Sequence, residues 1–268
     1  MTHKMYLIPF HVLVILNYVL FLLYKDSIKD RLNELYPDRE EFGGSWKFLT
    51  HWNIALQLVY FCIAFLNDLF GTESKIKQDA NFLQILRDYL FATLAFPIGT
   101  FVPIVFWILY NLDRDLVYPQ DLDDVFPQIT NHMMHTTPLP SQILELVLVY
   151  HSYPSRKLGF PTIIIFCQSY IGWIFYVAYA GGPWVYGVFE VLSQSQRLIF
   201  VIGLSIFSVF LYLTGECCNK KVWKIQTDDE ISSKDIYNNI QQSININSIA
   251  GRNYCNVKNY KKYKDKRL

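Results

Sequence analysis

The sequence predicts an all-α fold, a polytopic membrane protein with a bundle of six transmembrane helices and a polar, disordered C-terminal tail. Of its 268 residues, 52% are hydrophobic and only 18% are charged, whereas soluble domains carry roughly 25% charged residues. The apolar residues also gather in long stretches that nearly lack charge. A helix needs about 20 such residues to cross a hydrocarbon core about 30 Å thick.

Six stretches have the length and composition of membrane-spanning helices. Five of them contain no Asp, Glu, Lys or Arg, and the remaining one contains only Glu145. In lipid, each helix satisfies its own backbone hydrogen bonds. The expected spans are residues 5–24, 48–67, 89–112, 125–150, 158–180 and 198–215. The uncharged stretch from residue 158 runs on to residue 189 through "GGP", which is typical of a re-entrant or interfacial segment.

The chain divides into a membrane domain, residues 1–216, and a tail, residues 217–268. The tail holds eleven Lys and Arg against five Asp and Glu and has no core-forming pattern, so we expect it to be mostly disordered. Basic segments favour the cytoplasmic side, where anionic lipids attract them. Six crossings then place both termini in the cytoplasm. The membrane is expected to be the cell membrane or that of the endoplasmic reticulum. We expect the tail to be solvated or to lie on the membrane, with no nucleic-acid partner.

The expected fourth helix carries a stripe of polar side chains, which hydrocarbon penalises. At 100° per residue, the stripe lies within an arc of roughly 80°. Its members are Asn131, His135, Gln142 and Glu145. Pro138 falls in the same arc. Because Pro138 and Pro140 remove backbone donors, the helix should kink or open just past His135.

The expected second helix carries a matching stripe. Thr50, Gln57 and Asp68 fall within roughly 20°, with Asn53 about 60° to one side. Both stripes should face the bundle interior. The two helices run in the same direction, and Thr50 and His135 lie in the same half of the membrane. The sequence therefore allows these two side chains to meet.

A threonine beside a histidine suits nucleophilic catalysis, because the hydroxyl needs a base and histidine has a pKa near neutral pH. Alternatively, Thr50 bonds back to its own helix and His135 hydrogen-bonds a neighbouring helix. The sequence contains no GxSxG, P-loop or GxGxxG motif, which disfavours a nucleotide-dependent enzyme.

A metal site is a further alternative. His132 and His135 are three residues apart, and a third ligand would have to come from elsewhere, since zinc needs three or four. The candidates are His51, Glu145 and Asp68. However, there is no HExxH motif, and His132 points about 100° away from the polar stripe.

Six segments, in order along the chain, resemble the androgen-induced gene 1 family. The resemblance covers about residues 5–216 and excludes the tail. The segments are "GGSWKFLT" (43–50), "LAFPIGTFVPIVFWILYNLDRDLVYP" (94–119), "NHMMHTTPLP" (131–140), "YPSRKLGF" (153–160), "WVYGVFE" (184–190) and "FLYLTGE" (210–216). Each motif is short, but six in order with preserved spacing are specific.

The resemblance implies a six-helix membrane hydrolase that acts on fatty acid esters of hydroxy fatty acids. The threonine nucleophile of the family lies in a motif like "WKFLT", which corresponds to Thr50. The histidine is the second one in a motif like "NHxxHTT", which corresponds to His135. The "HWN" that follows Thr50 departs from the family pattern, and the pattern assigns no acidic partner to His135.

The implied mechanism proceeds through an acyl-threonine, with His135 as the general base for Thr50 and then for water. Asn131 and Asn53 are candidates to bind the oxyanion or the substrate. The substrate is a lipid ester within the bilayer, and no metal or organic cofactor is required. The alternative is a non-catalytic membrane regulator or adaptor, in which the stripes serve helix association. A small transporter is a third possibility.

Overall fold

We describe the fold from a computed structural model, which covers residues 4–28, 34, 42–124, 126–180 and 184–224. Every regular element in these ranges is helical, which confirms the all-α prediction. The "GGP" at 181–183 and nearly all of the predicted disordered tail, residues 225–268, lie outside the described residues. Residues 4–222 are the part of the chain that forms the helical bundle.

Five helical segments are long and apolar enough to span a membrane. They coincide with five of the six expected spans, so the protein is a multi-pass membrane protein. The five are α1 (Lys4–Ser27), α3 (Leu49–Phe70), α4 (Phe82–Leu90) continuing through the π-helical turn η4 (Phe91–Ala95) into α5 (Phe96–Leu112), α8 (Arg156–Tyr179), and α10 (Gln194–Val222).

The expected fourth span is not one continuous helix, so the count of six membrane-spanning helices stays a prediction. It consists of α6 (Gln128–His135) and α7 (Pro138–Leu148), each too short to cross a membrane alone. Pro138 is the first residue of α7, where a missing backbone N–H is tolerated. The break therefore lies just past His135, where the prolines predicted it.

Hydrogen bonds at the break satisfy several of its backbone groups. The backbone N–H groups of Thr136 and Thr137 both donate to the carbonyl of His132, at 2.9 and 3.0 Å. The carbonyl of His135, which a continuous helix would use internally, instead accepts a bond of 3.0 Å from the indole of Trp107. Irregular backbone at membrane depth is thus covered by protein.

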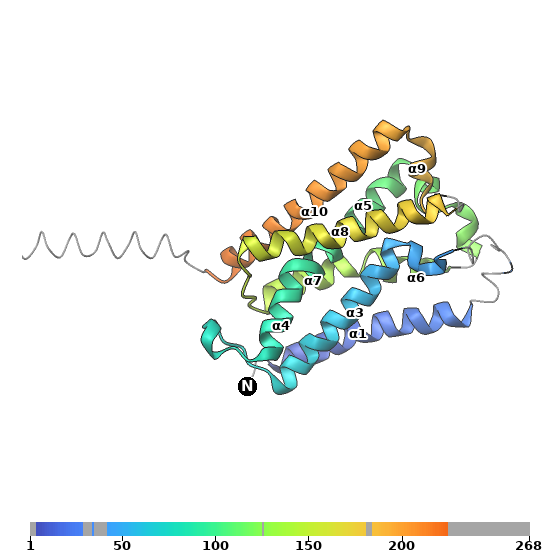
Figure 1. Cartoon of the computed structure of the whole chain (residues 1–268). Helices are drawn as coiled ribbons and strands as arrows, with labels where there is room; N and C mark the ends of the chain where they lie inside the picture. Colours follow the sequence, from blue (N-terminus) through green and yellow to red (C-terminus); the bar gives the residue numbers. More distant parts are fainter. Residues whose placement is uncertain (1–3, 29–33, 35–41, 125, 181–183, 225–268) are drawn as a thin grey trace, which may run out of the picture. The chain divides into compact units, whose positions relative to one another are not determined.

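Short elements complete the described chain. They are the 3-10 turns η2 (Gly44–Lys47), η3 (Lys77–Asp79), η5 (Arg114–Leu116) and η6 (Gln120–Asp124), and the short helix α9 (Gly187–Val191). Most lie in the connections between the long helices (Figure 1).

The bundle has two ends, which we call the first-loop end and the amino-terminal end. At the first-loop end, the indole of Trp173 on α8 donates to the carbonyl of Trp46, in the loop between α1 and α3. At the amino-terminal end, the backbone N–H of Ser152 before α8 donates to Asp88 on α4. Since α5 ends at the first-loop end and α8 begins at the other, α6 and α7 lead the chain between the two ends (Figure 1).

The two predicted polar stripes face each other inside the bundle. Gln142 on α7 donates to Gln57 on α3 at 2.6 Å, and Gln57 donates to the carbonyl of Ala95 in the π-helical turn at 2.9 Å. Gly99 on α5 makes room for this pair, since a Cβ there would lie 2.5 Å from Gln57 Nε2. All members of both stripes except Thr50 are buried, which confirms their predicted direction.

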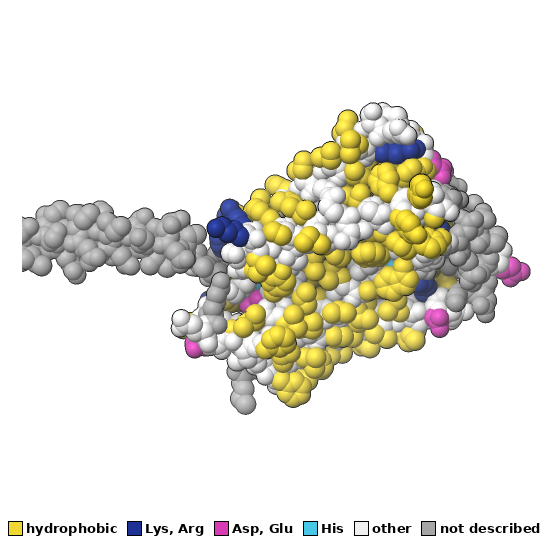
Figure 2. Space-filling model, viewed as in Figure 1, with side chains coloured by type: hydrophobic (Ala, Val, Ile, Leu, Met, Phe, Trp, Pro, Cys, Tyr) yellow, Lys and Arg dark blue, Asp and Glu magenta, His cyan; other side chains and the backbone are white. Residues whose placement is uncertain are grey.

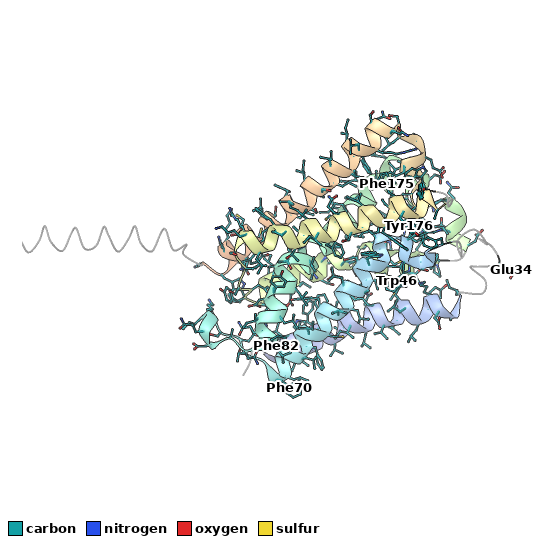
Figure 3. The ribbon with its side chains drawn as sticks, in the orientation of Figure 1. Glu34, Trp46, Phe70, Phe82, Phe175 and Tyr176 are labelled. Carbon is teal, nitrogen blue, oxygen red and sulfur yellow. The ribbon has the colours of Figure 1, made fainter. Side chains whose placement is uncertain are left out.

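On the face shown in Figure 2, apolar side chains are spread over the long helices, and charged side chains gather toward the two ends. Exposed aromatic side chains also mark the ends (Figure 3). Trp46 and Tyr176 lie at the first-loop end, and Phe70 and Phe82 at the amino-terminal end. Such a band between aromatic and charged borders is typical of a surface that faces lipid.

Candidate active site

Thr50 lies in the first turn of α3, at the first-loop end. The helix begins here because η2 ends at Lys47 and Phe48 is extended. The Thr50 hydroxyl Oγ1 lies 3.1 Å from Nε2 of His135, the last residue of α6. The structure therefore brings together the two residues that phase and helix direction allowed to meet.

Asn131 fixes the protonation of the His135 ring. Its side-chain oxygen Oδ1 lies 2.7 Å from His135 Nδ1, and because this oxygen only accepts hydrogen bonds, Nδ1 carries the proton. In the neutral ring, Nε2 is then the acceptor that faces the Thr50 hydroxyl. A hydroxyl, an imidazole and an orienting group in this order are the parts of an activated nucleophile.

Aromatic side chains of α5 hold the His135 ring in place. Phe106 stacks on it with ring centroids 3.5 Å apart and planes within 2°, and Trp107 holds its carbonyl. Sequence reasoning missed these contacts and the orienting role of Asn131. The sequence held a sign of each. Asn131 precedes His135 by one helical turn, and "VFW" (105–107) places two adjacent aromatic residues in a segment that resembles the family.

A chain of hydrogen bonds through two tyrosines holds the first turn of α3. The Leu49 N–H donates to the Tyr186 hydroxyl at 2.9 Å, and the two tyrosine hydroxyls lie 3.0 Å apart. Tyr170 donates to the carbonyl of Lys47 at 3.0 Å. Since that carbonyl only accepts, Tyr186 must donate to Tyr170. The chain fixes the backbone on both sides of Phe48 and therefore the position of Thr50.

Two cavities meet at Thr50. One, of about 110 Å³, is lined almost entirely by apolar side chains of α5, α8 and α10. The other, of about 810 Å³, lies between α1, the first loop and α6, and includes His135, Lys25 and Asp26 in its walls. Thr50 thus lies in the wall of both cavities.

Asn53 is the second residue predicted to bind an oxyanion or substrate. It lies one helical turn after Thr50 and is completely buried. Its Oδ1 accepts a bond of 3.0 Å from Gln57, while its Nδ2 has no hydrogen-bond partner among the described residues. A buried donor without a partner is rare and costly. Asn53 therefore has a donor to offer, although it lines neither cavity.

The residues of the alternative metal site are scattered. His132 is exposed and bonds Thr136 at 2.9 Å, whereas Glu145 and Asp68 lie with His11 on α1. Within the ranges that the structure describes, no group of three or more His, Cys, Asp or Glu is arranged to hold a metal ion.

Glu145 and Asp68 belong instead to a buried ionic cluster toward the amino-terminal end. The cluster consists of His11, Asp68, Arg87, Asp88, Glu145 and His151. His11 bridges two carboxylates, with Nδ1 2.6 Å from Asp68 and Nε2 2.9 Å from Glu145. Because both ring nitrogens face carboxylate oxygens, a doubly protonated His11 satisfies both contacts.

The other half of the cluster joins α4 to the loop before α8. Arg87 Nη2 donates to Asp88 at 2.8 Å and to the carbonyl of Tyr150. Burial lowers the pKa of His151 although the Asp88 carboxylate beside it acts in the opposite direction, and the His151 ring stacks on Phe91 at 3.7 Å. The cluster therefore ties together elements far apart in sequence.

Comparison with known proteins agrees with the motifs. The family described as FAR-17a/AIG1-like protein matches residues 6–220. The human androgen-induced gene 1 protein is 40% identical over 201 residues, which cover 72% of this chain and 84% of that protein. The androgen-dependent TFPI-regulating protein of Rattus norvegicus is 41% identical over 216 residues, covering 78% and 90% of the two chains.

A membrane protein of Schizosaccharomyces pombe is 21% identical over 178 residues, which cover 65% of this chain and 75% of that protein. No solved structure gives a significant match. The family match spans the whole helical bundle, and the two mammalian relatives share about 40% identity over most of their length. The chain therefore belongs to the FAR-17a/AIG1-like family.

Proposed function

We propose that this protein is an integral-membrane hydrolase that cleaves the ester bond of fatty acid esters of hydroxy fatty acids. Thr50 is the nucleophile and His135 is the general base. The observation that carries the proposal is the hydrogen bond of 3.1 Å between the Thr50 hydroxyl and the unprotonated nitrogen of His135, where two cavities meet. The substrate class comes from the family resemblance.

In the first half of the reaction, His135 Nε2 takes the Thr50 proton while Oγ1 attacks the ester carbonyl carbon. The tetrahedral intermediate collapses, the ester C–O bond breaks, and the protonated ring gives its proton to the departing alkoxide. The products are an acyl-threonine and a hydroxy fatty acid. Asn131 keeps the ring in the tautomer and orientation that both transfers need.

In the second half, His135 takes a proton from water, and the resulting hydroxide attacks the acyl-threonine. The bond to Oγ1 breaks, His135 returns the proton to Thr50, and the fatty acid leaves. The positive end of the α3 helix dipole at its first turn supports the developing oxyanion, whereas the N–H groups of Leu49 and His51 already donate to Tyr186 and Phe48. Asn53 and Asn131 remain the side-chain candidates for this role.

We also propose that α6 and α7 together form a sixth, broken crossing. With two connecting residues they hold 21 residues, or about 30 Å at 1.5 Å each if placed end to end. Both termini would then lie in the cytoplasm, with the active site near the opposite face of the cell membrane or endoplasmic reticulum. Single cysteines at the exposed residues Ile76 and Leu112 should react with an impermeant thiol reagent from opposite sides.

A regulator or adaptor is the alternative, and a relative supports it by name, since the rat protein is called a TFPI-regulating protein. In that case the bond between Thr50 and His135 would only join two helices. The test is ester hydrolysis in membranes by Thr50→Ala and Thr100→Ala. Thr100 is a matched control, a buried threonine whose hydroxyl bonds its own helix at 2.8 Å.

We expect Thr50→Ala to lose hydrolysis and Thr100→Ala to keep it, with equal amounts of inserted protein. Alanine suits a helix at least as well as threonine, so the loss would report the missing oxygen. Full activity in Thr50→Ala, or no hydrolysis by the wild type, would favour the regulator hypothesis.

A further inference from the structure

The two cavities that meet at Thr50 differ in chemistry. The smaller, apolar cavity is lined by side chains such as Ile98, Val102, Val201 and Leu204. The larger cavity has polar groups in its wall and charged groups, Lys25 and Asp26, at the end of α1. Desolvating a charged group in the apolar cavity would be costly, whereas an unbranched hydrocarbon chain loses nothing there.

The position of His135 relative to the cavities determines on which side of Thr50 the leaving group and the water must lie. His135 lines the larger cavity and not the apolar one, whereas Thr50 lines both. In an ester hydrolase the histidine must protonate the oxygen of the leaving arm and later activate water. Both events must therefore occur on the side of the larger cavity.

Tyr186, Phe106 and Val117 also line both cavities and form the partition between them with Thr50. Tyr186 is held by its bonds to Leu49 and Tyr170, and Phe106 by its stack on His135. A fixed partition keeps the two spaces distinct, so each arm of a bound ester is directed to one of them.

We propose that the two arms of the ester are sorted by these cavities. The carbons next to the ester carbonyl of the acyl arm, the arm that becomes attached to Thr50, enter the apolar cavity, whose volume of about 110 Å³ holds a short segment of that arm. The leaving hydroxy-acid arm binds in the larger cavity, with its carboxylate at Lys25, and water enters by the same route after it departs. Lys25 is a specificity-determining residue for an anionic leaving arm. This inference rests on the proposed function and deepens it.

The first test changes the anionic end of the leaving arm. Lys25→Gln and the wild type are assayed on the free acid and on its methyl ester, which differ only in that charge. A lost charge-assisted bond corresponds to roughly a tenfold or greater rise in KM. We expect this rise for the free acid alone, with kcat and the KM of the methyl ester unchanged.

Labelling of Thr50 by a neutral fluorophosphonate should be the same in both proteins, which controls for folding. An equal change for both substrates, or no change for either, would overturn the role of Lys25. Failure of the wild type to hydrolyse either ester would instead refute the proposed function.

The second test narrows one cavity at a time. Val201→Phe reduces the apolar cavity, and Leu22→Phe reduces the larger one. Because a misfit of one methylene already changes kcat/KM by about 10–200-fold, Val201→Phe should lower kcat/KM at least tenfold for long acyl arms and leave short ones nearly unchanged. Leu22→Phe should do the same for long leaving arms.

The reverse assignment, in which Val201→Phe discriminates by the length of the leaving arm, would overturn the proposed sorting. So would a uniform loss in which neither variant discriminates by length while both still react with the fluorophosphonate.

Discussion

The bundle contains two buried polar regions that differ in charge and access. At the first-loop end, Thr50, His135 and Asn131 form a neutral chain of hydrogen bonds next to two cavities. Toward the other end, the ionic cluster around Glu145 is completely enclosed, and its members line neither cavity. Both regions place polar groups at membrane depth, where burying a polar group costs free energy.

The difference shows that buried polarity alone does not identify an active site. The contacts of His11 join α1 to α3 and α7, and those of Asp88 with the backbone of Ser152 and the ring of His151 join α4 to the loop before α8. A substrate has no access to it through either cavity. At the other site, by contrast, Thr50 lines both cavities. We therefore expect changes in the cluster to affect stability and changes at the site to affect activity.

The largest effect should come from Glu145→Ala. It removes the acceptor of both His11 Nε2 and the Tyr60 hydroxyl, and an uncompensated buried charge costs about 3–5 kcal/mol. We expect a large drop in the melting temperature in detergent, or loss of folded protein. Leu144→Ala, a change at an exposed apolar neighbour, is the control. A Glu145→Ala protein as stable as this control would contradict a stabilising role for the ionic cluster.

His135→Ala should have the next largest effect, and on activity alone. Loss of general base catalysis corresponds to about 10²–10⁴-fold in kcat, without a matching loss of stability. His132→Ala should remain near wild type, because the His132 ring is exposed, hydrogen-bonds Thr136 and stacks on Trp107. Equal losses in the two variants, together with inactivation by a chelator, would favour the metal site instead.

Asn131→Ala should lower kcat by an intermediate amount. The missing hydrogen bond to His135 corresponds to about 1–3 kcal/mol, or roughly 5–150-fold. Asn131→Asp keeps an acceptor oxygen for Nδ1 and should restore much of the activity, which separates orientation of the ring from oxyanion binding through the amide. If Asn131→Asp were as impaired as Asn131→Ala, Asn131 would act through its amide N–H, as an oxyanion donor, and not by orienting the His135 ring.

Tyr186→Phe should have the smallest effect. It keeps the ring that separates the cavities but removes the acceptor of the Leu49 N–H, a bond worth about 0.5–1.5 kcal/mol. We expect a few-fold decrease in kcat with little change in KM. Tyr176→Phe, at an exposed position of α8, serves as the control. A loss as large as that of His135→Ala would mean that the Tyr186 hydroxyl takes part in the chemistry.

Much of the site could be predicted from the sequence because it depends on local rules. Helical phase predicted the buried stripes, and the prolines predicted the break after His135. Helix direction placed Thr50 and His135 in the same half of the bundle. The hydrogen bonds from Tyr170 to Lys47 and from Leu49 to Tyr186 could not be predicted, because they connect residues more than 120 positions apart and follow no spacing rule.

The ionic cluster was missed because of where the expected spans began and ended. The third span was expected to begin at residue 89 and the fourth to end at residue 150. Arg87 and Asp88 therefore appeared to lie in the loop before the third span, and His151 in the loop after the fourth. In the structure α4 begins at Phe82, and these charged groups are enclosed by the bundle. His11 appeared as a single polar residue in an apolar helix, and only the packing of α1 against α3 and α7 shows its partners.

The most direct test of the account is to identify the residue that forms the covalent intermediate. Membranes containing the protein are treated with an acyl-directed fluorophosphonate, and the labelled peptide is sequenced by mass spectrometry. If Thr50 is the nucleophile, a single adduct should form on Thr50. It should be absent in Thr50→Ala, retained in Thr50→Ser and greatly slowed in His135→Ala. An adduct on another residue, or undiminished labelling of Thr50→Ala, would contradict Thr50 as the nucleophile.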